Sequence, residues 1–319
     1  MNNNRASILR LLKNSTIISG EQIAQTLSIS RTAVWKHIQT LKKKGYCINS
    51  VPREGYELLS SPNVSIEEEL KAALSSSKLI SAVHYFHSID STNSYAKQIL
   101  KQNAREGTIV ISDIQTKGRG RKQRNWVSPE GGLWFSILLK PQIPIQHAMI
   151  VTMAASLAVS YGIMDSTGLL TIIKWPNDLL IGGKKICGIL TEIDAELDRI
   201  NSMVMGIGIN VNNPLNEHLK NNSTTLEKEL NKHIPLASLL HNIIAHLEHL
   251  YGLVIMNNFE SIRVQWLDRT DTIGKTIRVH DQDHYIEGTA FGITEKGHLI
   301  LKTSTGTTQI LSGNIEYIN

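Results

Sequence analysis

Cysteine is scarce in this chain of 319 residues, which contains only Cys47 and Cys187. Two cysteines cannot build a disulfide framework, so a reducing compartment is the simplest interpretation. Long apolar runs are missing as well: no eighteen consecutive residues are apolar, and Met1 is followed by polar residues. These absences predict neither a membrane span nor a signal peptide, and the expected location is cytoplasmic, with no membrane partner.

Neither sign of charge dominates, because 33 basic and 28 acidic residues leave a net charge of +5. That balance permits a polyanionic partner but does not require one. Hydrophobic residues make up 41% of the chain, which is typical of a globular protein with a sizeable core. The length favours two or three domains. No metal site is predicted, because His241, His246 and His249 have no cysteine or carboxylate at ligand spacing.

The first sixty residues have the pattern of helices followed by two short strands. Ser30 can cap a third helix that continues to Lys44, and Gly45 can end it. Strand-like runs follow at 46–48 and 55–59. Residues 1–60 therefore resemble a winged helix-turn-helix DNA-binding domain.

The third of these helices would be the recognition helix. Its first residues are hydroxylic, basic or polar, and such side chains reach bases and phosphates in a major groove. The basic run at 42–44 points the same way. The alternative is a solvated helix face in a protein-binding module. The predicted DNA-contacting residues are Ser30, Arg31, Thr32, Lys36 and His37.

The rest of the chain falls into three parts. Residues 61–78 are predicted to be a linker helix. Residues 79–270 alternate strands with helices, including one at 146–160, and predict an α/β domain with a mixed sheet. Residues 271–319 contain glycine-punctuated alternating runs, which predict a small β-barrel similar to an SH3-like domain. The fold class is therefore multidomain α+β.

A basic, glycine-rich run at 117–126 reads Lys-Gly-Arg-Gly-Arg-Lys-Gln-Arg-Asn-Trp. Such a run exposes backbone N–H groups and guanidinium forks together, which suits a phosphate or an acyl-phosphate. Taken alone, it could equally be a nucleic-acid-binding or solvated basic patch. Strand-like stretches at 108–112 and 131–139 flank it, so a loop within a sheet is the favoured interpretation.

A second segment, at 174–188, reads Lys-Trp-Pro-Asn-Asp, then a Gly-Gly turn, then a strand with Lys185. Asp90-Ser91-Thr92-Asn93 and Gln115 precede it, and Gly-Ile-Gly-Ile-Asn-Val follows at 206–211. In this order and spacing, the motifs resemble those of the bifunctional biotin protein ligase/biotin operon repressor family. The resemblance covers nearly the whole chain. It implies that 79–270 is a catalytic domain of the class II synthetase/biotin–lipoate ligase type.

The resemblance implies a reaction in two steps. Biotin and ATP, with Mg²⁺, give biotinyl-5′-adenylate, and a lysine of a biotin carboxyl carrier protein then takes the biotin. It also implies operator DNA as a partner and a homodimer that forms when the adenylate binds, so that the adenylate acts as co-repressor. An enzyme for these steps works mainly by positioning and electrostatics.

The resemblance also implies site residues. Lys185 would neutralise charge between carboxylate and α-phosphate, Arg121 would hold the adenylate, and Trp126 would face the adenine. Biotin contacts are implied for Ser91, Thr92, Asn93, Gln115, Arg119, Gly120, Arg121, Lys185 and Gly188. Nucleotide contacts are implied for Arg121, Trp126, Lys174, Asn177, Asp178 and Asn210. Catalytic roles are implied for Lys185 and Arg121.

The chain departs from the family at Gln123, where a second Gly-Arg commonly follows, and this departure bears on how the loop orders. The stretch 312–315 is looser than the family pattern and receives no catalytic role. Two other functions are considered. A lipoate or octanoyl ligase shares the catalytic fold, but the Gly-Arg-Gly-Arg and Lys-Trp-Pro-Asn-Asp pair favours biotin. A pure biotin-sensing regulator has less need of Lys185 and Arg121.

Overall fold

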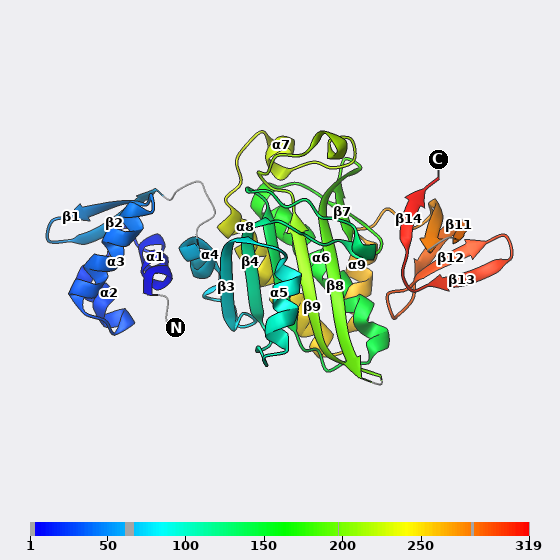
Figure 1. Ribbon diagram of the computed structural model, residues 1–319, viewed down its shortest axis with the longest axis horizontal. Coiled ribbons are helices and arrows are strands. Elements are labelled where there is room, and N and C mark those ends of the chain that lie inside the picture. The colour runs from blue at the N-terminus through cyan, green and yellow to red at the C-terminus, as the bar shows by residue number, and fades with distance from the viewer. Residues whose placement is uncertain (1–3, 61–66, 197, 282–283, 319) are drawn as a thin grey trace. The chain divides into compact units, whose positions relative to one another are not determined.

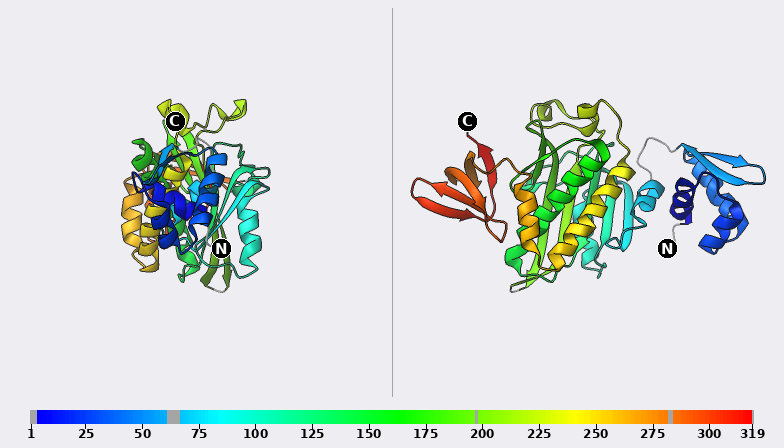
Figure 2. Two further views of the ribbon diagram at one scale, coloured as in Figure 1. Left: turned by 90° about the vertical axis from the view of Figure 1, so that its left-hand side faces the viewer. Right: turned by 180° about the vertical axis from the view of Figure 1, so that it is seen from behind.

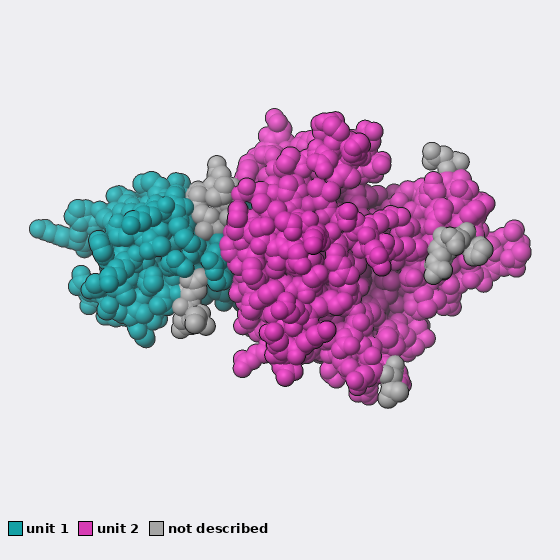
Figure 3. Space-filling model, in the orientation of Figure 1, with its two compact units in different colours: residues 1–76, 235–240 teal, residues 77–234, 241–319 magenta. Residues whose placement is uncertain are grey.

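The computed structural model describes residues 4–60, 67–196, 198–281 and 284–318. It divides into two compact units, residues 1–76 with 235–240 and residues 77–234 with 241–319 (Figure 3). Residues 61–66, where the linker is predicted to start, lie outside the described residues.

The N-terminal part of the first unit has the predicted helix-turn-helix and wing. Ser19 caps the second helix in a reciprocal capping box with Gln22, and Ser28 ends it in a left-handed conformation. The Ser30 hydroxyl then accepts from the Ala33 N–H at 3.1 Å and caps the third helix, as predicted. The elements are α1 (Asn4–Lys13), α2 (Gly20–Leu27), α3 (Arg31–Lys43), β1 (Cys47–Val51) and β2 (Gly55–Ser60) (Figure 1).

Helix α4 (Glu67–Leu74) packs on α1 in the same unit and carries two buried carboxylates. Glu68, fully buried, pairs with Arg5 Nε at 3.1 Å and with Lys44 Nζ at 2.8 Å. Glu69 pairs with the ammonium of Lys13. Because a buried carboxylate is costly without cationic partners, these contacts fix α4 against α1 and the C-terminal end of α3.

The centre of the second unit is a mixed sheet. Its strand order is β3-β4-β5-β9-β8-β7-β6 over the described residues. Only β3 and β4 are parallel, so the predicted mixed sheet is confirmed. Every residue of β5 is buried. The strands are β3 (Ala82–Ile89), β4 (Thr108–Gln115), β5 (Leu133–Leu139), β6 (Ile172–Lys174), β7 (Asp178–Ile181), β8 (Lys184–Glu196) and β9 (Arg199–Ile209).

Helices cover both faces of this sheet. α5 (Thr92–Leu100) lies on one face, and α6 (Ala148–Thr167), α8 (Leu236–Ile255) and α9 (Phe259–Leu267) cover the other (Figures 1 and 2). Residues 145–167 are long and apolar enough to cross a membrane, but 72% of the window is buried inside the protein. This is therefore a core helix. The short helices are η1 (Arg121–Gln123), η2 (Ile145–His147), η3 (Glu217–Leu219) and α7 (Leu226–Leu230).

The prediction for the helix at 146–160 was too short. α6 continues to Thr167, where Gly168 ends it with a φ of 75°. Gly162 lies just beyond the predicted end of the helix, inside α6. It looks like a helix breaker in the sequence, but a Cβ there would lie 2.5 Å from Ile243, so the glycine lets α8 approach.

The C-terminal residues form an antiparallel sheet with the order β13-β12-β11-β10-β14 in the described part. Ile277, Leu299 and Leu301 are among its buried residues. The predicted strand-rich domain is confirmed. The strands are β10 (Thr276–Asp281), β11 (His284–Ile293), β12 (Leu299–Thr303), β13 (Gly306–Ile310) and β14 (Asn314–Tyr317).

Candidate active site and nucleic-acid interface

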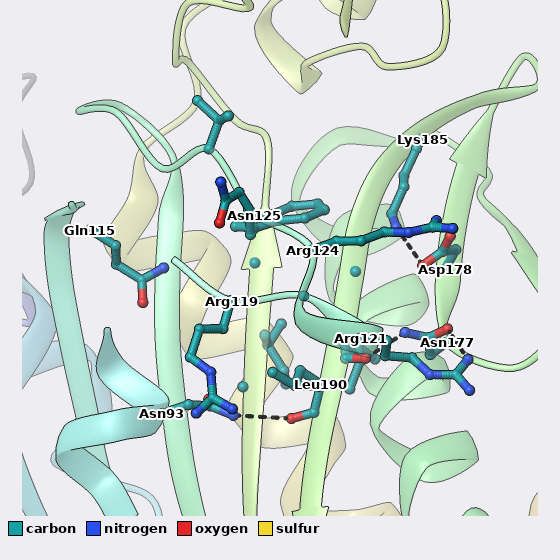
Figure 4. A pocket seen from close by; sticks show the side chains of 18 of the residues that line it. Asn93, Gln115, Arg119, Arg121, Arg124, Asn125, Asn177, Asp178, Lys185 and Leu190 are labelled. Carbon is teal, nitrogen blue, oxygen red and sulfur yellow. Dashed lines mark hydrogen bonds and ion pairs between the residues drawn. The ribbon is translucent and has the colours of Figure 1, made fainter. Parts of the chain in front are cut away.

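The Gly/Arg run is a loop between β4 and β5 that folds back on itself. The Gly120 N–H donates to the Arg124 carbonyl at 2.7 Å, and the Trp126 N–H donates to the Gly118 carbonyl at 2.9 Å. A Cβ on Gly118 would lie 2.3 Å from the Trp126 carbonyl oxygen. Glycine is therefore required there, and the fold-back turns the arginine side chains toward the sheet (Figure 4).

Under this loop lies a cavity of about 260 Å³. It collects side chains from α5, from the loop and from strands β8 and β9, which are far apart in the sequence (Figure 4). The predicted site residues that line it are Ser91, Thr92, Asn93, Gln115, Arg119, Gly120, Arg121, Trp126, Asn177, Asp178, Lys185, Gly188 and Asn210.

One end of the cavity is neutral and polar. The backbone N–H and the hydroxyl of Thr92 both donate to Gln115 Oε1, at 2.8 and 3.1 Å. Gln115 Nε2 in turn donates to the Ser128 hydroxyl at 2.9 Å. The Ser136 hydroxyl donates to Asn93 Oδ1 at 2.6 Å. This network fixes hydroxyl and amide groups in place, so a neutral ligand with a carbonyl and N–H groups fits this end.

Glycines form the floor of the cavity. A Cβ on Gly206 would lie 2.0 Å from Asn93 Oδ1, and one on Gly208 would lie 2.4 Å from Trp126 Nε1. The absent side chains let Asn93 and Trp126 lie flat against β9. Among the described residues, none accepts a hydrogen bond from the buried Trp126 Nε1. This N–H is enclosed and faces Gly208, so the indole ring packs directly against β9.

Gly206→Ala tests this floor. The new methyl displaces the Asn93 amide, so we expect the KM for the ligand of the polar end to rise about tenfold, as for the loss of a hydrogen bond in a buried site. The KM for a ligand at the opposite end of the cavity should change little. Gly252→Ala is the matched control, because a Cβ there has no neighbour within 4 Å. Equal effects of the two substitutions in steady-state kinetics would refute the assignment.

The other end of the cavity is cationic. Lys185 Nζ lies 2.6 Å from Asp178 Oδ1 and 5.2 Å from the centroid of the Trp126 ring. Arg121 Nη1 donates to Asn177 Oδ1 at 3.1 Å and to the Gly313 carbonyl at 3.2 Å. Burial lowers the pKa of Arg121 from its ordinary value. An arginine remains charged even so, and two cations at one end suit a carboxylate and a phosphate.

Lys174 is the one predicted ligand-contacting residue that does not line the cavity. Its Nζ lies 4.7 Å from the centroid of the Tyr317 ring. Burial lowers its pKa, partly opposed by Asp178. The sequence predicted one turn between Lys174 and the strand with Lys185, but β7 intervenes. Lys174 and Asp178 therefore face each other across the β6–β7 hairpin, and only Asp178 lines the cavity.

Several lining residues were missed. Asn314 lines the cavity and the neighbouring Gly313 carbonyl holds Arg121, although no role was predicted for 312–315. These residues come from the C-terminal sheet, and no local signal marked them. Gly206 and Gly208, which belong to the motif at 206–211, line the cavity as well. The other lining residues to which no role was assigned are Arg124, Asn125, Val127, Phe135, Ile189, Leu190, Ile207, Leu219 and Ser223.

The recognition helix α3 presents one polar, basic face. Arg31, Thr32 and Lys36 are exposed on it, whereas His37 is half-buried, and burial followed by the Arg5 charge lowers its pKa. Ser30 is exposed but uses its hydroxyl as the helix cap. Lys44, counted in the basic run, is committed to Glu68. The sequence analysis missed Trp35, which lies on the same face and is 53% exposed.

The fold and cavity define a domain whose pocket is polar at one end and cationic at the other, with a helix-turn-helix module before it. Family models agree with this division. The HTH domain matches 4–57, the biotin/lipoate A/B protein ligase family matches 85–210, and the biotin protein ligase C-terminal domain matches 272–316.

Similar proteins extend the match along the chain. The bifunctional ligase/repressor BirA of Bacillus subtilis is 40% identical over 94% of this chain and 93% of its own length. Its Escherichia coli counterpart is 27% identical over 92% and 91%. A biotin protein ligase from Aquifex aeolicus, solved with biotin and ATP, has a TM-score of 0.66 at 28% identity, covering 75% of this chain and all of its own. The chain belongs to the bifunctional biotin ligase/repressor family.

Proposed function

We propose that this chain activates biotin with ATP and transfers it to a lysine of a biotin carboxyl carrier protein. One observation carries the proposal: the same cavity has a neutral end built by Thr92, Asn93 and Gln115 and a cationic end built by Arg121 and Lys185. Biotin has this division, with a ureido ring at one end and a carboxylate at the other.

In the first step, a carboxylate oxygen of biotin bonds to the α-phosphorus of ATP. The bond from that phosphorus to the oxygen of the β-phosphate breaks, and pyrophosphate leaves. Both reactants are anions, so their approach needs a cation between them. Lys185 supplies it, and the contact with Asp178 holds the ammonium in place. Mg²⁺ enters with ATP as part of the substrate.

In the second step, the lysine amine of the carrier attacks the acyl carbon of biotinyl-5′-adenylate. AMP leaves with the bonding electrons, and the nitrogen loses a proton. The leaving group is already activated, so the protein needs no nucleophile of its own. Cys187 is unsuited to such a role, because burial raises the pKa of its thiol and the side chain is enclosed.

Turnover with biotin, ATP and an apo-carrier protein tests this function. We expect pyrophosphate release and one biotin per carrier. A lipoate or octanoyl ligase would transfer its own acid in preference to biotin. A pure sensor would bind biotin without releasing pyrophosphate, so either result would overturn the proposal.

The first unit adds repression of biotin synthesis through operator DNA, with biotinyl-5′-adenylate as co-repressor. The exposed Arg31, Thr32 and Lys36 of α3 support contacts to bases and phosphates, and Trp35 offers an apolar surface of the kind that meets thymine methyl groups. The reaction and the operator both lie in the cytoplasm, which is the proposed location.

Arg31→Ala should weaken operator binding about tenfold and reduce the salt slope of log K by about one, because one cationic contact is lost. Biotin ligation should be unchanged. Arg105→Ala, an exposed arginine of the second unit, is the control and should leave operator binding as it is. Fluorescence anisotropy over a salt series measures both quantities, and an unchanged Kd and slope for Arg31→Ala would remove it from the interface.

We also propose that the adenylate promotes a homodimer, with operator affinity rising as the dimer forms. The Gly/Arg loop has few apolar residues, so a ligand that binds Arg121 and Trp126 lowers the entropic cost of ordering it. A non-hydrolysable adenylate analogue should therefore raise the dimer fraction in sedimentation velocity, and ATP alone should raise it far less. Equal dimer fractions with both ligands would mean a ligase without a ligand switch.

A further inference from the structure

Glu192 of β8 lies outside the cavity but contacts two residues that line it. Its Oε2 accepts from Asn93 Nδ2 at 3.0 Å and from Arg119 Nη1 at 3.4 Å. Its Oε1 accepts from Lys97 Nζ at 3.0 Å and from Arg119 Nη2 at 3.2 Å. Each carboxylate oxygen therefore has one donor from helix α5 and one from the Gly/Arg loop, and the guanidinium binds as a two-pronged fork.

The two donors from α5 lie four residues apart, so Asn93 and Lys97 share one face of that helix. Asn93 is 4% exposed and the Glu192 side chain 19%, whereas Lys97 and Arg119 are much more open. The carboxylate thus sits where helix, loop and strand converge. Burial raises the pKa of Glu192, but hydrogen bonds from Asn93 and Lys97 and the charge of Arg119 outweigh it, so the pKa lies below its ordinary value.

The carboxylate also determines which way the Asn93 amide points. Its Nδ2 donates to Glu192 and reaches the Leu190 carbonyl at 3.4 Å, and its Oδ1 accepts from Ser136 at 2.6 Å. A flipped amide would place Oδ1 against a carboxylate and a carbonyl. Asn93 Oδ1 is therefore directed toward Gly206, on the cavity floor, where its second lone pair is available to an N–H donor.

We propose that Glu192 is a positioning residue for biotin: it sets the Asn93 amide and anchors the Arg119 end of the loop so that both meet the ureido ring. Glu192 acts through these two residues and touches no substrate itself. This inference rests on the proposed biotin site. It adds to that site a carboxylate of β8 that lies outside the cavity and orients Asn93 and Arg119.

Glu192→Gln is the sharpest test, because it keeps the size of the side chain and turns one acceptor oxygen into a donor. In either orientation of the new amide, its NH₂ group faces one Arg119 nitrogen and one donor of α5, which is Asn93 Nδ2 or Lys97 Nζ. Donor then faces donor, and these hydrogen bonds are lost. We expect biotin Kd by calorimetry to rise roughly tenfold or more, the range for losing hydrogen bonds to a charged group. KM for ATP should change less than twofold, and the melting temperature should stay close to wild type.

Two further variants separate positioning from a general structural effect. Lys97 pairs with the same carboxylate but does not line the cavity. Lys97→Ala should therefore change biotin Kd by less than about threefold, as for exposed ion pairs. In a double-mutant cycle with Arg119→Ala, the Glu192→Gln effect should shrink, because coupled residues are not additive. Additive effects, or equal losses in biotin and ATP affinity, would overturn the proposal.

The outcome also distinguishes this inference from the proposed function. If the wild-type protein binds no biotin, the biotin site itself is wrong. If the wild type binds biotin and Glu192→Gln binds it equally well, the site stands and Glu192 has no positioning role.

Discussion

Lys185→Ala should abolish adenylate formation, with pyrophosphate release about a hundredfold to a thousandfold slower, as when one preorganised charge-stabilising group is removed. The cation that separates the biotin carboxylate from the α-phosphate is lost, and Asp178 loses its ion-pair partner, which lies 2.6 Å from it. Single-turnover pyrophosphate release measures the step directly.

Lys184→Ala is the matched control, because Lys184 is the neighbouring residue of β8 and does not line the cavity. It should keep near-wild-type rates. Circular dichroism should show the same fold for both variants. Pyrophosphate release from Lys185→Ala at the wild-type rate would assign the charge-neutralising role to another residue.

Arg121→Ala should let biotinyl-5′-adenylate escape. A hydrogen bond to a charged group contributes roughly 1.5–3 kcal/mol, which corresponds to escape about ten to a hundred times faster. The released mixed anhydride reacts with any lysine nearby, so bystander proteins should acquire biotin. Mass spectrometry of a mixture of carrier and unrelated protein detects this labelling.

Lys117→Ala provides the comparison, because Lys117 is an exposed cation of the same loop that does not line the cavity. It should label the carrier alone. If Arg121→Ala also labels only the carrier, at the normal rate, then Arg121 does not retain the adenylate.

The sequence predicted well those features that depend on residue type and local spacing. The flanking strands favoured a loop with close backbone approach and anion binding for the glycines and arginines at 118–121, and in the structure Arg119, Gly120 and Arg121 line the cavity. The cap at Ser30 is a local hydrogen bond, so the start of the third helix could be predicted from the sequence. The strand-like stretches predicted at 108–112 and 131–139 correspond to β4 and β5, because a run of apolar residues is a local pattern as well.

Features that depend on tertiary contacts were not predictable from local pattern. Glu192 looks like an ordinary polar residue in a strand, because nothing near it in the sequence announces Asn93 or Arg119. The cavity contribution of Asn314 depends on the docking of β14, and the length of α6 depends on Gly162 meeting Ile243. Each of these depends on a partner more than seventy residues away.

Where the loop departs from the family pattern, at Gln123, the backbone has a left-handed conformation. Lys122 and Gln123 have φ values of 52° and 60°, in the left-handed region that favours glycine. Glycine adopts this backbone without steric cost, which agrees with the second glycine that the family resemblance implies here. The chain keeps the loop shape with a non-glycine residue at a small conformational cost, of about 1 kcal/mol.

The bond from Arg121 to the Gly313 carbonyl links residues 192 positions apart. During synthesis, domains fold as they leave the ribosome, N-terminal first. The helix-turn-helix and the central sheet therefore emerge before the carbonyl that holds Arg121 and before Asn314. A nascent chain at that stage has its DNA-reading helix but an incomplete pocket. A chain that ends before Gly313 therefore lacks the carbonyl that accepts from Arg121 and one residue of the cavity lining.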